Sequence, residues 1–265
     1  MSYEAHIRKE YRPYIQSLAD DIRARRNPNF FWPTGTQVYV GRQGSGKTIS
    51  AVHHIRKLKA RYPKAILVSN LQFLEWEAVP VSAVEEIENA LALVREQPGR
   101  YLLYTGADEL ARVLTQVNNG FYGVIYVIDE IHTYFNALES KDMPMYVFTE
   151  ISQQRKQRKL IVGTSQLFMR MAKPLREQCD NLIMCNTIMG ILTVQKVYDG
   201  MTLEQDYDGS LIGKQKKMGF FFHNREIRGA FDTFQKVVSG AVQFEEQHRL
   251  FVRPEKKGFL GRKKN

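Results

Sequence analysis

Apolar and polar positions alternate along the chain in blocks that predict an α/β protein. Short apolar runs typical of strands buried in a sheet occupy residues 36–40, 65–69, 101–104, 124–128 and 160–165. Between these runs, apolar residues recur at three- and four-residue steps, which predicts helices over residues 49–58, 81–95, 107–118 and 150–159. This order predicts a mostly parallel central sheet flanked by helices.

The two ends of the chain differ from this core. Residues 3–26 read as a basic amphipathic helix, and residues 27–33 as a linker rich in aromatic side chains. Strand-like runs at 181–186 and 191–198 predict antiparallel strands at the sheet edge near the C-terminus. We expect the aromatic residues of 220–236 to be buried in the core, with a docking surface as the alternative.

A phosphate-binding motif follows the first predicted strand. Residues 41–48 match the complete pattern G-x-x-x-x-G-K-[ST], and the helix predicted to begin there would point its positive end at an anion. The glycines let backbone N–H groups surround the phosphates, Lys47 reaches the β- and γ-phosphates, and Thr48 offers its hydroxyl to Mg²⁺. The sequence therefore predicts a site for ATP made of Gly41, Arg42, Gln43, Gly44, Ser45, Gly46, Lys47 and Thr48.

Two acidic residues, Asp129 and Glu130, end the apolar run at 124–128. Adjacent carboxylates at the end of a buried strand are costly without a cation. We expect Asp129, with Thr48, to hold Mg²⁺, and Glu130 to orient and polarise the water that attacks the γ-phosphate. This arrangement predicts a hydrolase.

The strand predicted at 160–165 ends at Gln166. Parallel sheets bind ligands at the carboxyl ends of their strands, so Gln166 would sense the γ-phosphate or the attacking water if its strand lies beside that of Asp129. Capping a loop is the alternative role. The arginines around this strand are candidates for a finger that reaches the nucleotide held by a neighbouring subunit: Arg155, Arg158, Arg170 and Arg176.

The formal net charge is +10, from 38 lysines and arginines and 28 acidic residues, and part of the excess is clustered. Residues 153–176 carry seven basic residues and no acid, and the tail at 253–265 is a second basic block. Phosphate backbones are the expected partner of such clusters, and double- or single-stranded DNA is the expected ligand. An acidic membrane surface could attract the same residues. Cys179 and Cys185 are expected to be buried free thiols rather than metal ligands.

The phosphate-binding loop (P-loop), the IDEIH sequence at 128–132 and the TSQ sequence at 164–166 together resemble the FtsK/HerA superfamily of DNA-pumping ATPases. Within it, the chain is similar to the zonular occludens toxin-like assembly proteins of filamentous phages and to phage genome-packaging ATPases, and residues 68–70 resemble the first group. The resemblance implies a RecA/FtsK-like P-loop NTPase of the additional-strand, catalytic-glutamate type. The strands predicted between the P-loop and the acid pair imply that an extra strand is inserted between the strands of these two motifs in the sheet. The resemblance also implies a ring of subunits that uses ATP to move DNA, with a capsid or membrane protein as a further partner.

Zonular occludens toxin-like proteins usually carry a membrane-spanning segment, and no apolar stretch here approaches the roughly 18 to 20 residues that a bilayer requires. A secretory signal is not evident either. These features favour a DNA translocase that packages a phage genome, located in the host cytoplasm, with the virion or peripherally at a membrane. A membrane-associated ATPase for filamentous-phage extrusion is the alternative.

Other P-loop functions fit the motifs less well. A kinase needs an acceptor site and does not require a glutamate beside Asp129, and a nucleotide-gated scaffold would not need hydrolysis. A regulatory GTPase is disfavoured because the chain has no Asn-Lys-x-Asp motif for guanine. The predicted organisation is a basic N-terminal helix and linker at 1–35, an ATPase core with edge strands at 36–240, and a basic tail at 241–265.

Overall fold

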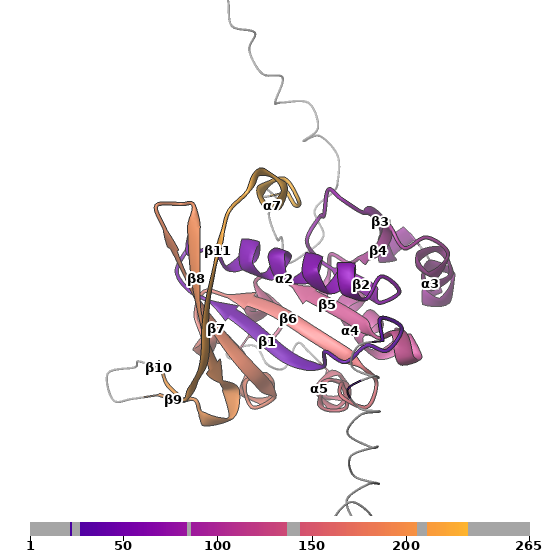
Figure 1. Ribbon diagram of the computed structural model, residues 1–265. Coiled ribbons are helices and arrows are strands. Elements are labelled where there is room, and N and C mark those ends of the chain that lie inside the picture. Colours follow the sequence, from indigo (N-terminus) through magenta and orange to yellow (C-terminus); the bar gives the residue numbers. More distant parts are fainter. Residues whose placement is uncertain (1–21, 23–26, 84–85, 137–143, 206–210, 233–265) are drawn as a thin grey trace, which may run out of the picture.

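The computed structural model describes residue 22 and residues 27–83, 86–136, 144–205 and 211–232 (Figure 1). The expected helix at 3–26, apart from residue 22, and the basic tail at 241–265 lie outside these residues. Within the described part, none of the helices is long and apolar enough to cross a bilayer.

A nine-stranded sheet forms the centre of the molecule, with the strands in the order β11-β8-β7-β1-β6-β5-β2-β4-β3. The strands are β1 (Gly35–Val40), β2 (Ile66–Ser69), β3 (Glu77–Pro80), β4 (Arg100–Leu103), β5 (Val124–Ile128), β6 (Lys159–Ser165), β7 (Cys179–Ile188), β8 (Leu192–Asp199) and β11 (Gln215–Phe222). The strands from β7 to β3 in this order pair in parallel, and β8 pairs antiparallel with both β7 and β11. Two short strands, β9 (Glu204–Gln205) and β10 (Leu211–Ile212), form a separate hairpin.

Helices cover both faces of the parallel part of the sheet (Figure 1). One face packs against α2 (Lys47–Arg61), with α7 (Arg225–Arg228) beside that helix. The other face packs against α3 (Ile87–Glu96), α4 (Ala107–Gln116), α5 (Met145–Ser152) and α6 (Lys173–Arg176). Short 3-10 turns lie at η1 (Val81–Ala83), η2 (Gly120–Tyr122), η3 (Ile131–Thr133), η4 (Phe168–Arg170) and η5 (Gly200–Thr202).

The order of strands confirms the predicted mostly parallel sheet with antiparallel edge strands, and it also confirms the additional strand between β1 and β5. We expected the strands that lie between the two motifs in the chain to supply this insertion. The inserted strand is instead β6, which follows the acid pair, while β2, β4 and β3 lie beyond β5. The P-loop after β1, the acid pair after β5 and the end of β6 therefore meet at one edge of the sheet.

The helix expected at 150–159 is shorter than the sequence suggests. Helix α5 ends at Ser152, residues 153–158 form turns, and Lys159 already begins β6. These turns contain only glutamine, arginine and lysine, so they offer no apolar side chain to pack against the sheet. Lys159 is buried where its ammonium group donates to the Leu114 carbonyl at 2.7 Å and pairs with Glu150 at 3.0 Å.

Two expectations about side-chain burial have different outcomes. Cys179 and Cys185 are buried free thiols, as expected, and burial raises the pKa of Cys185 to about 11. The aromatic residues after 220 were expected in the core, and Phe231 is buried. Phe220 and Phe222, however, are 69% and 64% exposed, because they lie on the face of β11 that no described helix covers.

Protonation of His54 on α2 is expected to destabilise the fold. Burial, with smaller effects of Lys217 and Lys57, lowers the pKa of His54 to about 4, whereas in an unfolded chain it is about 6.5. Below about pH 6.5 only the unfolded state takes up this proton, so the free energy of unfolding falls until about pH 4, by about 3 kcal/mol in total. Urea unfolding at about pH 7.5 and about pH 4.5 should show a smaller pH difference for His54→Gln than for wild type. An unchanged difference would contradict this prediction.

Candidate nucleotide and catalytic site

The P-loop closely contacts the β7–β8 strands. Gly46 has φ +85°, and a Cβ at this position would lie 2.4 Å from the Thr187 hydroxyl and 2.6 Å from that of Thr193. At Gly41, with φ +152°, a Cβ would lie 2.7 Å from the Cys185 carbonyl oxygen. Only glycine allows this backbone path and this close approach. The edge strands therefore form one wall of the loop.

The loop presents groups suited to phosphate. Lys47 begins α2 and is only 7% exposed, and its ammonium group donates to the Arg42 carbonyl at 3.3 Å. The Ser45 hydroxyl is buried and has no hydrogen-bond partner among the described residues. A buried donor without a partner is costly unless a ligand satisfies it. The positive end of α2 and these two side chains fit a nucleotide phosphate, as the motif predicts.

Thr48 and Asp129, the two expected metal ligands, are in contact. The Thr48 hydroxyl donates to the Asp129 carboxylate at 3.0 Å, and the Thr164 hydroxyl donates to the same oxygen at 2.7 Å. Burial raises the pKa of Asp129, while these two hydrogen bonds act to lower it. Hydroxyl and carboxylate oxygens are the ligands that Mg²⁺ prefers, so the pair fits this cation.

The Asn70 side chain, at the end of β2, fixes the turn after β5. The Asp129 backbone N–H donates to the Asn70 amide oxygen at 2.8 Å, and the Asn70 amide nitrogen donates back to the Asp129 carbonyl at 3.0 Å. This reciprocal pair holds the backbone of the metal-binding residue. Sequence reasoning gave Asn70 no such role, because the contact joins residues 59 positions apart.

Glu130 adopts an uncommon backbone conformation, with φ +50° and ψ +51°. Its N–H donates to the Thr164 hydroxyl at 2.9 Å, which holds the residue in this left-handed conformation. Burial and the neighbouring Asp129 carboxylate raise the pKa of Glu130, and Lys47 acts in the opposite direction. A carboxylate with a raised pKa beside the P-loop is suited to act as a general base.

The structure brings Gln166 to this carboxylate. Strand β6 pairs with β5, as the expectation for Gln166 required, and a hydrogen bond from its side chain acts to lower the pKa of Glu130. His132 also contacts the site, with its Nδ1 3.3 Å from the Glu130 carboxylate and 3.2 Å from the Ser165 hydroxyl. His132 and Ser165 belong to the IDEIH and TSQ motifs, but the sequence predicts no role for them, because only the pairing of β5 with β6 shows that they meet.

The candidate arginine fingers lie in two regions. Arg170, on η4, is close enough to Glu130 and His132 to lower the pKa of both. Arg176, on α6, contacts the Met169 sulfur at 2.8 Å. Arg170 is thus placed beside the acid pair.

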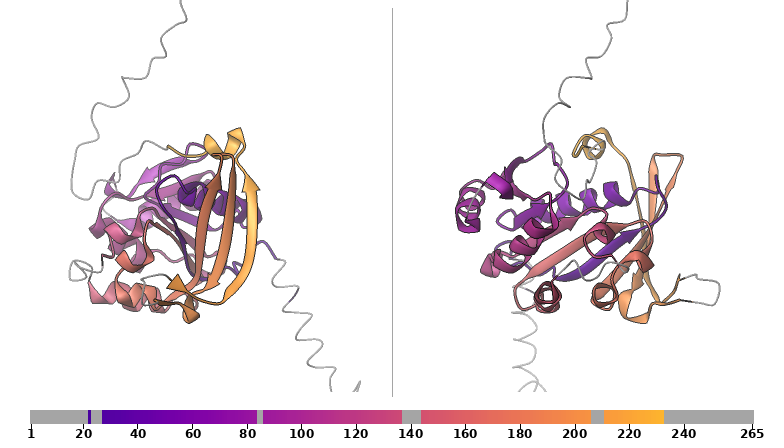
Figure 2. Two further views of the ribbon diagram at one scale, coloured as in Figure 1. Left: turned by 90° about the vertical axis from the view of Figure 1, so that its left-hand side faces the viewer. Right: turned by 180° about the vertical axis from the view of Figure 1, so that it is seen from behind.

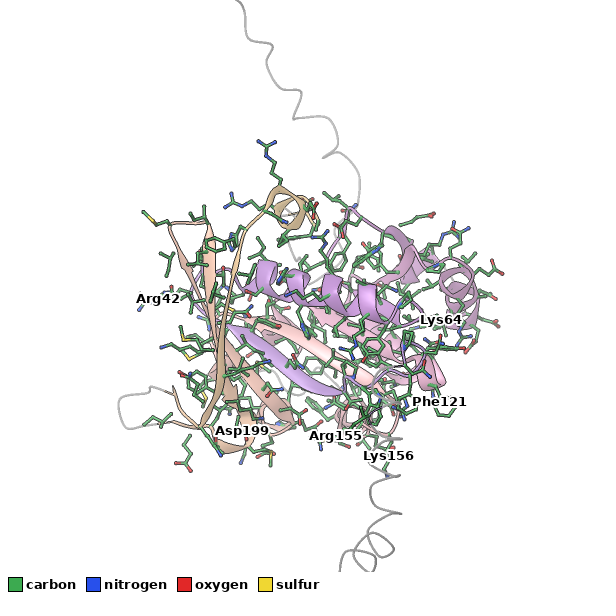
Figure 3. All side chains as sticks on the ribbon, viewed as in Figure 1. Arg42, Lys64, Phe121, Arg155, Lys156 and Asp199 are labelled. Carbon is green, nitrogen blue, oxygen red and sulfur yellow. The ribbon has the colours of Figure 1, made fainter. Side chains whose placement is uncertain are left out.

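Arg155 and Arg158 lie at the other end of the strands. Arg155 pairs with Asp180, whose carboxylate accepts a hydrogen bond from the backbone at the start of β1. Arg158 donates to the Phe31 carbonyl at 3.0 Å and lies 3.6 Å from the centre of the Phe30 ring. Figure 3 shows Arg155 and the P-loop residue Arg42 at opposite ends of β1. Arg155 and Arg158 could therefore act only on nucleotide held by another subunit.

Solved structures with the same fold include the N-terminal domain of zonular occludens toxin from Neisseria meningitidis. It is 14% identical, with a TM-score of 0.51, over 76% of this chain and 100% of that one. The genome packaging NTPase B204 from Sulfolobus turreted icosahedral virus 2, in complex with AMPPCP, is 12% identical, with a TM-score of 0.48, over 71% of this chain and 98% of that one. A search of the curated proteins gave no match.

The family model for zonular occludens toxin (Zot) matches residues 36–218, from the first residues of β1 into β11. This range contains the P-loop, the acid pair and the edge strands against which the P-loop packs. The match confirms the resemblance inferred from the motifs. The chain belongs to the zonular occludens toxin (Zot) family.

Proposed function

We propose that this protein hydrolyses ATP with Mg²⁺ and uses the energy to move phage DNA during virus assembly. The observation that carries the proposal is the hydrogen bond from Thr48 to Asp129, with Glu130 next in the chain. It joins the phosphate-binding loop to a carboxylate pair suited to a metal ion and a water molecule. A kinase or a nucleotide-gated scaffold would leave Glu130 without a use.

Each residue of the site has a defined part in this reaction. Mg²⁺, when bound, neutralises charge on the phosphate oxygens and fits the oxygens of Thr48 and Asp129. Lys47 and the P-loop N–H groups hold the β- and γ-phosphates. Glu130 accepts a proton from the attacking water, and Gln166, within reach of Glu130, responds to the presence of the γ-phosphate.

The DNA movement could serve either packaging or extrusion of the phage genome. The sequence favours packaging into a capsid, and membership of the Zot family supports the alternative of assembly and extrusion at a membrane. Packaging and extrusion would use the same ATPase site, and the protein would act in the host cytoplasm, with the virion or at a membrane surface. The exposed basic residues Arg155, Lys156, Arg170 and Lys173 support contact with DNA phosphates in either case.

The test is steady-state ATP hydrolysis by purified protein with and without DNA, at low and moderate salt. We expect double- or single-stranded DNA to stimulate turnover, and the stimulation to weaken as salt rises, because phosphate contacts release counterions. Absence of hydrolysis would refute the ATPase. If DNA does not change the turnover, the ATPase activity stands and its coupling to DNA is refuted.

A further inference from the structure

One face of the β7–β8–β11 strands is apolar and exposed. Residues directly opposite one another on these strands share a face. In one row across the strands, Lys196 of β8 lies between Met184 of β7 and Met218 of β11. In a second row, Leu192 lies between Ile188 and Phe222. Phe220 lies between the two rows, 6.5 Å from the Phe222 ring. At the tip of the β7–β8 hairpin, Met189 is 89% exposed. We name this surface the apolar face; its exposed residues are Met184, Ile188, Met189, Met218, Phe220 and Phe222.

No described element covers the apolar face. Figure 2 (left) shows β8 and β11 toward the viewer with no helix in front of them. The opposite face of the same strands is occupied, since Phe221 stacks on His53 of α2 with ring centroids 4.4 Å apart. Monomeric soluble proteins rarely expose a continuous apolar patch of this kind, and such patches mark sites of interaction.

The apolar face adjoins the nucleotide site. Thr187 and Thr193, which pack against Gly46 of the P-loop, alternate along β7 and β8 with Ile188 and Leu192 of the apolar face. The two threonine hydroxyls are hydrogen-bonded at 2.8 Å, and Thr193 is bonded to His223 at 2.7 Å. A partner seated on the apolar face would therefore contact the strands that form the wall of the P-loop.

Charge on the two edges of the sheet is complementary. Lys196 lies within the apolar face, and Lys214 and Lys216 lie beside it, with Lys216 paired to Asp199 at 3.2 Å. At the opposite edge, β3, α3 and the residues before each carry five acids against one arginine, Arg95; the acids are Glu75, Glu77, Glu86, Glu88 and Glu96. Leu74 and Leu93 are exposed on that side as well. The sheet thus has a basic apolar end and an acidic end with exposed leucines.

We propose that the apolar face binds the acidic β3–α3 side of a second copy of this chain. Such a contact is head-to-tail, and repeated contacts of this type form a ring when the rotation closes. The inference rests on the proposed function in one respect, because it places the neighbouring subunit beside the P-loop where ATP is hydrolysed. Burial of the aromatic side chains supplies the affinity, and the charges fix the orientation.

Sedimentation velocity over a range of protein concentrations tests the interface directly. We expect wild type to associate, and Phe220→Ser with Phe222→Ser to raise the dissociation constant at least about tenfold, as for the loss of central aromatic residues in an interface. Tyr146→Ser on α5, also exposed at 57%, is the matched control and should leave association unchanged. If the double variant does not fold by circular dichroism, Met189→Ser at the hairpin tip replaces it.

Charge reversal tests the choice of partner surface. Lys196→Glu with Lys214→Glu, and separately Glu88→Lys with Glu96→Lys, should each weaken self-association, and mixing the two variants should restore association between them.

Three results would overturn the proposal: a monomeric wild type at every concentration, association that survives the phenylalanine substitutions, or no association in the mixture. Binding of monomeric wild type to phosphatidylglycerol vesicles through Phe220 and Phe222 would identify a membrane as the occupant instead. If wild type does not hydrolyse ATP, the proposed function is refuted, and the sedimentation experiment still tests the interface.

Discussion

Replacing Glu130 with glutamine is expected to lower the rate of ATP hydrolysis at least about a hundredfold while ATP still binds. Glutamine keeps the size and hydrogen-bonding capacity of the side chain and removes its ability to accept a proton. The P-loop, Thr48 and Asp129 do not depend on the Glu130 carboxylate, so affinity should be preserved. Steady-state hydrolysis and binding of a fluorescent ATP analogue measure the two effects separately.

The control for this substitution is Glu177→Gln, which removes an exposed carboxylate that pairs with Lys173 at 3.7 Å. Its turnover should match that of wild type, because surface ion pairs contribute little. Near-normal hydrolysis by Glu130→Gln would show that another group activates the water. In that case His132, whose ring nitrogen lies 3.3 Å from the Glu130 carboxylate, would be the next candidate to examine.

Replacing Lys47 with alanine should weaken ATP binding at least about a hundredfold, within the range for removing one member of a buried charge pair. The Lys47 ammonium group is enclosed by the loop, where it donates to the Arg42 carbonyl at 3.3 Å. A phosphate would replace that weak contact with a charge-assisted one. Titration with the fluorescent ATP analogue measures the loss.

Lys57→Ala is the matched control, because Lys57 is an exposed lysine on the same helix. It should change neither affinity nor the circular dichroism spectrum. Equal loss of affinity in both variants would point to a general effect of positive charge on α2. Unchanged affinity in Lys47→Ala would refute the assignment of the P-loop as the phosphate site.

The parts of the site that the sequence predicts well are those that short segments encode by themselves. A P-loop needs its glycines and Lys47 within eight consecutive positions, and the pair Asp129–Glu130 directly follows an apolar run of the kind expected of a buried strand. Parallel strands then bring their carboxyl ends together, so the meeting of these segments follows from the fold class. The same reasoning predicts that Gln166 points into the crevice if its strand lies beside that of Asp129, and β6 does pair with β5.

Features that depend on long-range pairing could not be predicted. The identity of the strand inserted between β1 and β5 is a property of the whole sheet, and so is the contact between Asn70 and the Asp129 backbone. The basic cluster at 153–176 looked continuous in sequence, but β6 runs through it from one end of the sheet to the other. Arg155 and Arg170 are therefore far apart in space although only 15 positions separate them.

The packing of Gly46 against Thr187 and Thr193 has a consequence for the smallest fragment that can bind nucleotide. A fragment that ends before β7, at residue 178, would keep both sequence motifs and lose the strands that support the loop. Because Thr193 is in turn bonded to His223, the supporting wall is complete only when the chain extends past β11. We therefore expect nucleotide binding to require β7, β8 and β11 as well as the two motifs.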